Sequence, residues 1–235
     1  MKLSVVIPCY NEAPNLPALV AGYAVVAART DLELILVDNG STDDTPAVLA
    51  ALLKEPRYSF ARSLRVERNV GYGHGIRAGL AECRGEASAF SHADMQCRPE
   101  DVLRGFELYG KSGPGTVLVK GRRTNREGLE RFLSAGYSGL ACAALGIPAA
   151  DVNGQPKIFP RSLAALLAGG PDDFALDLYV LYRAARAGLR VVEFDVAFEP
   201  RLHGESKWAF NARAKLRGIL RFFRQIVRIR LGGYG

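Results

Sequence analysis

Two stretches decide the fold: LSVVIPCYNE at residues 3–12 and LELILVDNGS at residues 32–41. Each begins with an aliphatic run of strand length and ends in polar residues that favour a turn. A helical pattern over residues 16–28 separates the two stretches. A strand, a helix and a second strand in this order are typical of a βαβ unit, whose strands lie parallel in one sheet.

The alternation continues along the rest of the chain. Ser41 or Thr42 is expected to cap a helix that carries Asp43 and Asp44 in its first turn. Further strands are predicted near residues 64–67, 87–91, 116–120, 152–159 and 190–194. Further helices are predicted after the glycines at 71, 73 and 75, and over residues 102–109, 129–145 and 176–187. The sequence therefore predicts an α/β fold with a mostly parallel sheet flanked by helices.

The distribution of charge argues against one class of partner. The chain of 235 residues has 31 basic and 24 acidic residues, and eight of the basic residues but no acid lie within residues 207–235. Residues 1–206 therefore hold 23 basic and 24 acidic groups and are close to neutral. A neutral domain with a basic tail indicates a local anionic partner, and we expect no binding of nucleic acid.

The cysteines and the apolar runs indicate the compartment. Cys9, Cys83, Cys97 and Cys142 are far apart and match no zinc-site spacing, so reduced thiols are expected. No stretch approaches the roughly 18 uninterrupted apolar residues of a membrane span, and the amino-terminal apolar run is too short for a signal peptide. These features predict a cytoplasmic protein.

Polar clusters follow four of the predicted strands, at residues 8–12, 38–41, 69–75 and 92–96. Ligands of open parallel sheets bind at the carboxyl ends of the strands, so the four clusters together predict one nucleotide-sized pocket. Asp38 would accept hydrogen bonds from base N–H groups and Tyr10 would stack on the base. Alternatively, residues 38–40 form only a turn, and the glycines after residue 70 only begin a helix.

Six segments carry a resemblance to a known family. VVIPCYNE at residues 5–12, followed by LVDNGSTD at 36–43, resembles the amino-terminal signature of the family 2 inverting glycosyltransferases. The similarity extends through residues 69–73, 92–96, 120–123 and 201–208, as in the branch that acts on dolichol or polyprenyl phosphates. The resemblance implies a GT-A fold over residues 1–206. It also implies transfer of a sugar, with inversion, from a GDP- or UDP-linked donor to a polyprenyl or dolichyl phosphate.

The resemblance assigns residues to the donor site. Those expected to bind the nucleotide sugar are Pro8, Tyr10, Glu12, Asp38, Asn39, Gly71, Asp94 and Gln96. The Asp-x-Asp metal motif of the family corresponds to His92 and Asp94, followed by Gln96, and implies Mg²⁺ or Mn²⁺ as cofactor. His92 stands where the family has its first carboxylate. It either binds a softer ion such as Mn²⁺, contacts a phosphate oxygen, or fills space while Asp94 holds the metal.

Further cations match family positions that bind phosphate. Arg122 or Arg123, together with Arg131 and Ser134, is expected to bind the acceptor phosphate. Arg201, Ser206 and Lys207 match a segment that closes over the diphosphate. The resemblance thus implies catalytic roles for Asp94, Arg131, Arg201 and Lys207. Guanidinium suits these positions because its planar fork binds two phosphate oxygens at once.

The chain departs from the family over residues 151–159, where relatives often have Ser-Gly-Phe. The polar residues of this segment are expected to line the sugar pocket, and Lys157 is expected to meet a phosphate, so the identity of the sugar is not transferable. Asp177 lies where relatives that act on hydroxyl groups place a catalytic base, or else it balances a helix dipole. Two alternatives therefore stay open: a hydroxyl acceptor, or a nucleotide-sugar-binding subunit without activity.

The tail over residues 207–235 is predicted to be a basic amphipathic helix, with arginines on one stripe and bulky apolar residues on another. Such a helix suits an anionic membrane interface, which would make the protein peripheral on the cytoplasmic face of the membrane. The alternatives are packing on the domain with a solvated basic side, or contact with a membrane partner subunit.

Overall fold

A computed structural model describes residues 2–125, 128–147, 151–200 and 223–234, and for residues 128–135 it describes only the backbone. The amino-terminal half alternates strands and helices: β1 (Leu3–Cys9), α1 (Leu16–Ala27), β2 (Leu32–Asn39), α2 (Thr45–Leu52), the short 3₁₀ turn η1 (Pro56–Tyr58), β3 (Ala61–Val66), α3 (Tyr72–Ala81) and β4 (Ala87–Phe90). The second half holds α4 (Pro99–Ser112), β5 (Val117–Arg123), α5 (Gly128–Leu145), β6 (Lys157–Pro160), α6 (Arg161–Ala165), α7 (Ala175–Arg186) and β7 (Arg190–Val196). Residues 223–230 form a further helix, here called the tail helix.

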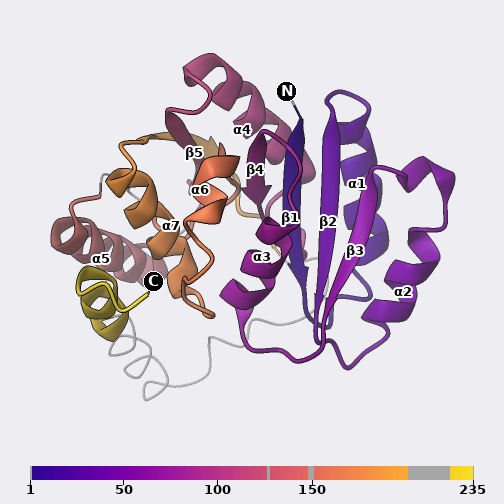
Figure 1. The fold of residues 1–235 in the computed structure, drawn as a ribbon, viewed down its shortest axis with the longest axis horizontal. Helices are drawn as coiled ribbons and strands as arrows, with labels where there is room; N and C mark the ends of the chain where they lie inside the picture. Colours follow the sequence, from indigo (N-terminus) through magenta and orange to yellow (C-terminus); the bar gives the residue numbers. More distant parts are fainter. Residues whose placement is uncertain (1, 126–127, 148–150, 201–222, 235) are drawn as a thin grey trace.

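The strands form one sheet in the order β3-β2-β1-β4-β6-β5-β7 (Figure 1). Its neighbouring strands pair in parallel except at β6, which is antiparallel to both β4 and β5. The predicted α/β fold with a mostly parallel sheet flanked by helices is thus confirmed. Strand β6 is shorter than predicted, because the chain turns at Asp151–Gly154 and enters the sheet only at Lys157.

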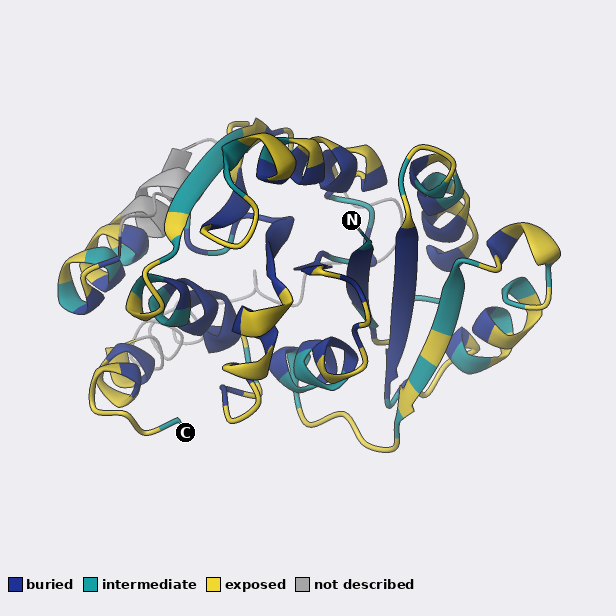
Figure 2. Ribbon diagram, turned by 45° about the horizontal axis from the view of Figure 1, so that its top comes forward, coloured by how far each residue is buried: buried dark blue, intermediate teal, exposed yellow. Residues whose placement is uncertain are grey.

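Helices cover both faces of the sheet, which explains why β2 is buried along its whole length. One core lies under α1, α2 and α4 and includes Leu16, Leu34 and Val102. The other lies under α3, α6, α7 and the end of α5 and includes Ile76 and Leu178. Figure 2 shows the central strands dark blue between these layers.

The expected cap of the second helix was wrong. Helix α2 begins at Thr45, and Asp43 and Asp44 precede its first turn. The side chains that were expected to cap it bind the loop after β1 instead. Ser41 Oγ accepts a hydrogen bond from the Asn11 N–H at 3.1 Å, and Thr42 contacts the Asn11 side chain. These contacts tie the loops after β1 and β2 together, at the predicted ligand edge.

The described end of the tail packs on the domain. Ile226 and Ile229 are buried in the core under α7, and Arg230 donates a hydrogen bond to the Ala144 carbonyl at the end of α5. Figure 1 shows the tail helix in yellow beside α5. The predicted helix before residue 223 lies outside the described residues. Within the part of the chain that the structure describes, no helix is both long enough and apolar enough to cross a membrane.

Candidate active site

The loops at the carboxyl ends of β1 and β2 form the first wall of the site. Cys9 and Asp38 are partners in the parallel register, so the residues that follow them leave the sheet side by side. Asp38 is buried; it pairs with Arg65 at 3.2 Å and accepts a hydrogen bond from the Ser41 N–H at 3.0 Å. Tyr10 is exposed at the rim, as stacking on a base requires.

Two other predicted donor residues lie next to this wall. Pro8 is half-buried within β1, and the Glu12 carboxylate accepts a hydrogen bond from Asn15 at 2.6 Å. The Glu12 N–H donates to Thr45 Oγ1 at 2.9 Å, which joins the loop after β1 to the start of α2. The wall is therefore held by hydrogen bonds within the chain.

The glycine loop before α3 adjoins the wall through Asn39, whose amide donates to the Gly71 carbonyl at 2.9 Å. Gly71 has φ of 149°, and a Cβ there would lie 2.3 Å from the Asp172 carbonyl oxygen. A Cβ at Gly73 would lie 2.4 Å from the Pro171 carbonyl oxygen. Close packing of residues 171–173 thus accounts for both glycines, and phosphate binding by this loop stays a prediction.

The loop after β4 carries the three residues matched to the metal motif. Asp94 is 7% exposed, and its carboxylate accepts a hydrogen bond from the Gln96 N–H at 3.2 Å. The Gln96 side chain donates to the carbonyl of Glu199 at 3.1 Å, and the Glu199 N–H donates back to the Gln96 carbonyl. This loop is therefore fixed against the chain that leads to the predicted closing segment at Arg201.

His92 belongs to a stack of three rings. Its imidazole lies 5.6 Å from the Tyr72 ring at an interplanar angle of 29°, and the other side of Tyr72 stacks on Phe174 at 4.7 Å. Burial lowers the pKa of His92 and outweighs the opposing charges of Asp94 and Asp177. The imidazole is therefore neutral at pH 7 and retains a lone pair for a metal ion or a hydrogen-bond donor.

A divalent ion bound by the three predicted residues would meet one carboxylate from Asp94, one amide from Gln96 and one imidazole from His92. Such a mixed set suits Mn²⁺ better than Mg²⁺, which prefers oxygen ligands. Among the described residues, no group of three or more His, Cys, Asp or Glu side chains is placed to bind a metal. An ion at Asp94 would therefore need the donor diphosphate and water to complete its coordination.

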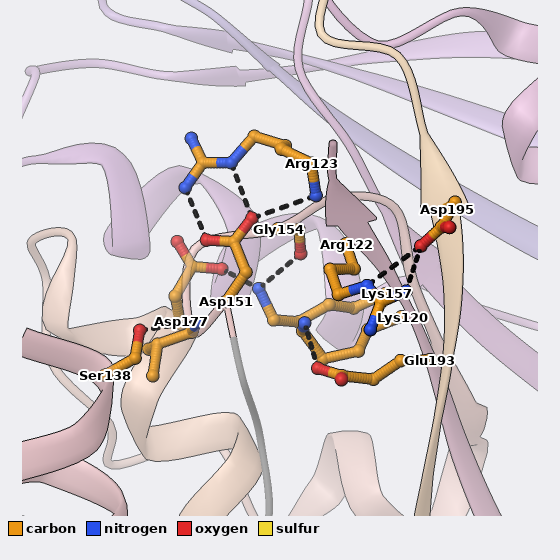
Figure 3. Close-up of polar contacts among 11 residues, drawn as sticks. Lys120, Arg122, Arg123, Ser138, Asp151, Gly154, Lys157, Asp177, Glu193 and Asp195 are labelled. Atoms are coloured by element: carbon orange, nitrogen blue, oxygen red, sulfur yellow. Dashed lines mark hydrogen bonds and ion pairs between the residues drawn. The ribbon is translucent and has the colours of Figure 1, made fainter. Parts of the chain in front are cut away.

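The ion pair between Lys157 and Asp177 is buried next to the end of β4, where Lys157 is the register partner of Phe90 (Figure 3). The two paired side chains are 0% and 2% exposed, and Asp177 also accepts a hydrogen bond from Gln155 at 2.7 Å. Burial lowers the pKa of Lys157, and the charge of Asp177 partly offsets that effect. The same Gln155 amide contacts the Tyr72 hydroxyl at 3.4 Å, which connects this pair to the ring stack.

A second, half-buried ion pair joins Arg123 and Asp151. The guanidinium donates two hydrogen bonds to the carboxylate, at 2.6 and 2.7 Å, and the Arg123 N–H adds a third at 3.1 Å. Burial alone would raise the pKa of Asp151, but the hydrogen bonds and the charge of Arg123 lower it to about 2. Arg122 forms a more exposed pair with Asp195 at 2.6 Å. Both arginines thus bind carboxylates in this structure, and acceptor binding by either stays a prediction.

Five residues that the resemblance assigns to phosphate binding have side chains outside the described part of the structure. Arg131 and Ser134 lie within α5, but their side chains are outside the described part of the structure. Arg201, Ser206 and Lys207 also lie outside the described residues. Their roles stay predictions from the resemblance.

Sequence reasoning missed the partners that give the site its structure. Phe174 and Asp172 were not expected to contact the glycine loop, and Asp151 was not expected to pair with Arg123. Alternating glycines at 71 and 73 were the available signal, since they indicate close approach of another backbone. No local pattern in the sequence identifies which segment makes that approach.

The chain matches the family described as "Glycosyl transferase family 2" over residues 4–164. A protein of Mycobacterium tuberculosis (strain ATCC 25618 / H37Rv), named as an uncharacterized glycosyltransferase, is 32% identical over 230 residues, which cover 95% of this chain and 97% of that protein. An undecaprenyl-phosphate 4-deoxy-4-formamido-L-arabinose transferase of Photorhabdus laumondii is 28% identical over 213 residues, which cover 89% of this chain and 63% of that protein.

Solved structures share the fold. Glucosyl-3-phosphoglycerate synthase of Mycobacterium tuberculosis, in complex with Mn²⁺, UDP and glucosyl-3-phosphoglycerate, superposes with a TM-score of 0.68 at 21% identity, covering 98% of this chain and 79% of that one. Mannosyltransferase PcManGT of Pyrobaculum calidifontis, in complex with GDP-Man and Mn²⁺, gives 0.67 at 20% identity, covering 97% and 64%. With its matching sequence and GT-A architecture, the chain belongs to glycosyl transferase family 2 and is a glycosyltransferase.

Proposed function

We propose that the enzyme transfers a sugar from a GDP- or UDP-linked donor to a polyprenyl or dolichyl phosphate, with inversion at the anomeric carbon. The buried ion pair between Lys157 and Asp177 carries this proposal. An enzyme that acts on a hydroxyl acceptor needs a carboxylate able to take the acceptor's proton. Asp177 is the candidate for that role, but Lys157 and Gln155 occupy its Oδ1 and burial separates it from solvent.

A phosphate acceptor needs no such base, because its oxygen is already ionised at neutral pH. Catalysis then consists of positioning the reactants and stabilising the charge of the departing diphosphate. We assign the acceptor phosphate to Arg131 and Ser134, and Arg122 and Arg123 are further candidates for this contact. We assign the diphosphate to Arg201 and Lys207.

The donor is assigned to the edge formed by the loops after β1, β2 and β4. Tyr10 and Asp38 would bind the nucleoside, and Asp94, with Gln96 and neutral His92, would bind a divalent ion. A bound Mn²⁺ or Mg²⁺ would neutralise charge on the diphosphate as it leaves. The neighbouring structures, which hold UDP or GDP-Man together with Mn²⁺, support a nucleotide-linked donor and a divalent ion as the ligands.

The name of one relative supports the acceptor class. The Photorhabdus protein is named as an undecaprenyl-phosphate transferase, and this chain spans 63% of its length. The synthase with the same fold is instead described with glucosyl-3-phosphoglycerate, a soluble phosphorylated compound. A lipid phosphate and a soluble phosphorylated compound are therefore the two classes of acceptor that an experiment must distinguish.

The tail helix supports a lipid acceptor. Phe223, Val227 and Leu231 are 49%, 55% and 78% exposed, and their spacing of four residues places them on one stripe. Arg224 and Arg228 are exposed beside that stripe, while the opposite side of the helix is buried. An apolar stripe flanked by arginines fits a helix that lies in an anionic membrane interface. We propose peripheral attachment of the enzyme to the cytoplasmic face of the membrane through this surface.

The test is a transfer assay on the full chain. Purified protein is incubated with a panel of GDP- and UDP-linked sugars, Mn²⁺ or Mg²⁺, and one of three acceptors: a short polyprenyl phosphate, the matching polyprenol, or 3-phosphoglycerate. The proposal predicts a sugar–phosphate-linked lipid with inverted configuration and no product from the polyprenol. Efficient transfer to the polyprenol or to 3-phosphoglycerate would contradict the proposed acceptor. Failure to transfer or hydrolyse any donor would favour the inactive-subunit alternative.

A further inference from the structure

Residues 171–174 lie between the tail helix and the candidate donor site, and each side of this short segment makes specific contacts. On the tail side, Gln225 is 6% exposed and its Nε2 donates to Asp173 Oδ2 at 2.6 Å. Asp173 Oδ1 accepts a hydrogen bond from the Ala175 N–H at 3.0 Å, at the first residue of α7. One carboxylate thus joins the tail helix to the beginning of α7.

On the other side, the segment packs on the glycine loop. The Asp172 carbonyl accepts a hydrogen bond from the His74 N–H at 3.1 Å. The Asp172 carboxylate lies 3.3 Å from His74 Nδ1 and also pairs with Arg77. The absence of a Cβ at Gly71 and at Gly73 allows the backbone of residues 171–173 to approach this closely.

The segment also reaches the metal-motif loop through rings. Phe174 stacks on Tyr72 at 4.7 Å with an interplanar angle of 18°, and Tyr72 stacks on His92 at 5.6 Å. His92 is two residues from Asp94 in the same loop. A continuous set of contacts therefore leads from Gln225 on the tail to the glycine loop, which Asn39 joins to the end of β2, and to the metal-motif loop of the proposed donor site.

Gln225 stands out chemically within the tail. Its Oε1 is buried without a hydrogen-bond partner among the residues that the structure describes. A buried amide that is only half satisfied costs stability relative to an aliphatic side chain. Its neighbours on the same buried side of the helix are Ile226 and Ile229, which show that an aliphatic residue fits there. The hydrogen bond to Asp173 is therefore what distinguishes Gln225 from the aliphatic residues that pack beside it.

We propose that Gln225 and Asp173 are positioning residues that hold residues 171–174 against the glycine loop and the ring stack. In this arrangement the tail helix sets the geometry of the donor site without touching the donor. The inference goes beyond the proposed acceptor and does not depend on it, since it concerns donor binding by a family 2 glycosyltransferase.

The first measurement is amide hydrogen exchange on the full chain without ligand. Gln225→Leu removes the hydrogen bond and keeps an apolar packing surface, and Ile226→Val is the matched control because it perturbs the adjacent buried position of the same helix. We expect Gln225→Leu to accelerate exchange at the Ala175 and His74 amides roughly threefold to tenfold, the effect of losing one hydrogen bond. Ile226→Val should leave both amides as in the wild type. Equal exchange in Gln225→Leu and wild type, or equal acceleration in both variants, would overturn the proposal.

The second measurement distinguishes a role of Gln225 in positioning the donor site from an effect on the stability of the fold alone. The affinities for UDP and for GDP with Mn²⁺ are measured by titration calorimetry at a temperature where all variants are folded. For whichever nucleotide the wild type binds, Gln225→Leu should bind roughly threefold to tenfold more weakly, and Ile226→Val should match the wild type. Gln225→Lys, which restores a donor facing Asp173, should recover most of the affinity and the slow exchange. Because the exchange measurement needs no substrate, its result stands apart from success or failure of the transfer assay.

Discussion

Lys157 on β6 and Asp177 on α7 form an ion pair whose two side chains are 0% and 2% exposed. The pair lies beside the ring stack of the candidate donor site, to which Gln155 connects it by hydrogen bonds to Asp177 and to the Tyr72 hydroxyl. A buried charge that loses its partner is strongly destabilising, so this pair has consequences for both the stability and the chemistry of the enzyme.

The first prediction concerns stability. Lys157→Met leaves the Asp177 carboxylate buried and unpaired, and we expect it to lower the free energy of unfolding by ~3–5 kcal/mol. The double variant Lys157→Met/Asp177→Leu removes both charges and should recover most of that loss. The free energy of unfolding of the wild type, the single variant and the double variant is measured by urea denaturation. Arg122→Met is the control, since it breaks the solvent-exposed pair with Asp195 and should leave the free energy of unfolding nearly unchanged. A Lys157→Met variant as stable as the control would show that the pair contributes little.

The second prediction is a pH dependence at the pair of Arg123 and Asp151. The pKa of Asp151 is lowered from 3.8 to about 2 in the folded protein. The carboxylate therefore contributes stability above its ordinary pKa and loses it as the pH falls from about 4 toward 2. The difference between the folded and unfolded pKa values corresponds to a contribution of roughly 2 kcal/mol.

Denaturant unfolding of the wild type and of Asp151→Asn at several pH values between about 6 and 2.5 tests this prediction. The difference in unfolding free energy between the two proteins should be largest above about pH 4 and shrink as the pH is lowered. A difference that stays constant over the whole range would mean that Asp151 titrates normally in the folded state.

The third prediction concerns the metal. Asp94→Ala removes the carboxylate nearest the proposed ion, and we expect kcat to fall roughly a hundredfold or more. Mn²⁺ binding, followed by electron paramagnetic resonance with UDP present, should weaken in parallel. Glu100→Gln, which neutralises an exposed carboxylate at the start of α4, is the control for loss of a negative charge. Near-wild-type transfer by Asp94→Ala would exclude this metal role.

A related prediction follows from the neutral imidazole of His92. His92→Asp converts the site to two carboxylates, so Mg²⁺ should support activity better relative to Mn²⁺ than it does in the wild type. The ratio of kcat/KM with the two ions is the measurement. An unchanged ratio would indicate that the side chain at this position stays away from the ion and acts only in the ring stack.

The tail helix makes a fifth prediction, on membrane binding. The wild type should sediment with anionic vesicles of phosphatidylglycerol and should be released by salt. Phe223→Ser together with Arg224→Gln removes one apolar and one basic group from the exposed stripe, and should weaken partitioning roughly tenfold or more. Arg29→Gln, on an exposed arginine at the end of α1, is the control and should bind as the wild type does. Equal sedimentation of all three proteins would contradict the proposed membrane surface.

The sequence predicted β1 and the polar turns that follow the first parallel strands, because both follow from local patterns. The aliphatic run 3–9 has the length of a buried strand, and polar residues end each of the first parallel strands. It did not predict the antiparallel direction of β6, a strand of four residues whose orientation depends on pairing with β4 and β5. Local patterns contain no information on such distant pairing.

The charged residues show the same limit. Arg123 was expected to bind an acceptor phosphate, and in the fold its guanidinium binds Asp151, 28 residues away in the chain. Asp177 was identified as a possible base from its position in the family, but its partner Lys157 comes from another element. The residue types identified these groups as candidates for the functional site, and only the tertiary structure shows which residues they pair with.

A phosphate acceptor needs no catalytic base, so Asp177, the candidate for that role, should be dispensable for transfer. The kcat of Asp177→Asn with a short polyprenyl phosphate as acceptor is measured on protein confirmed to be folded by circular dichroism. We expect kcat to stay within about tenfold of the wild-type value, because the acceptor oxygen is already ionised. A loss of roughly a hundredfold to ten-thousandfold in folded protein, the effect of removing a general base, would contradict it.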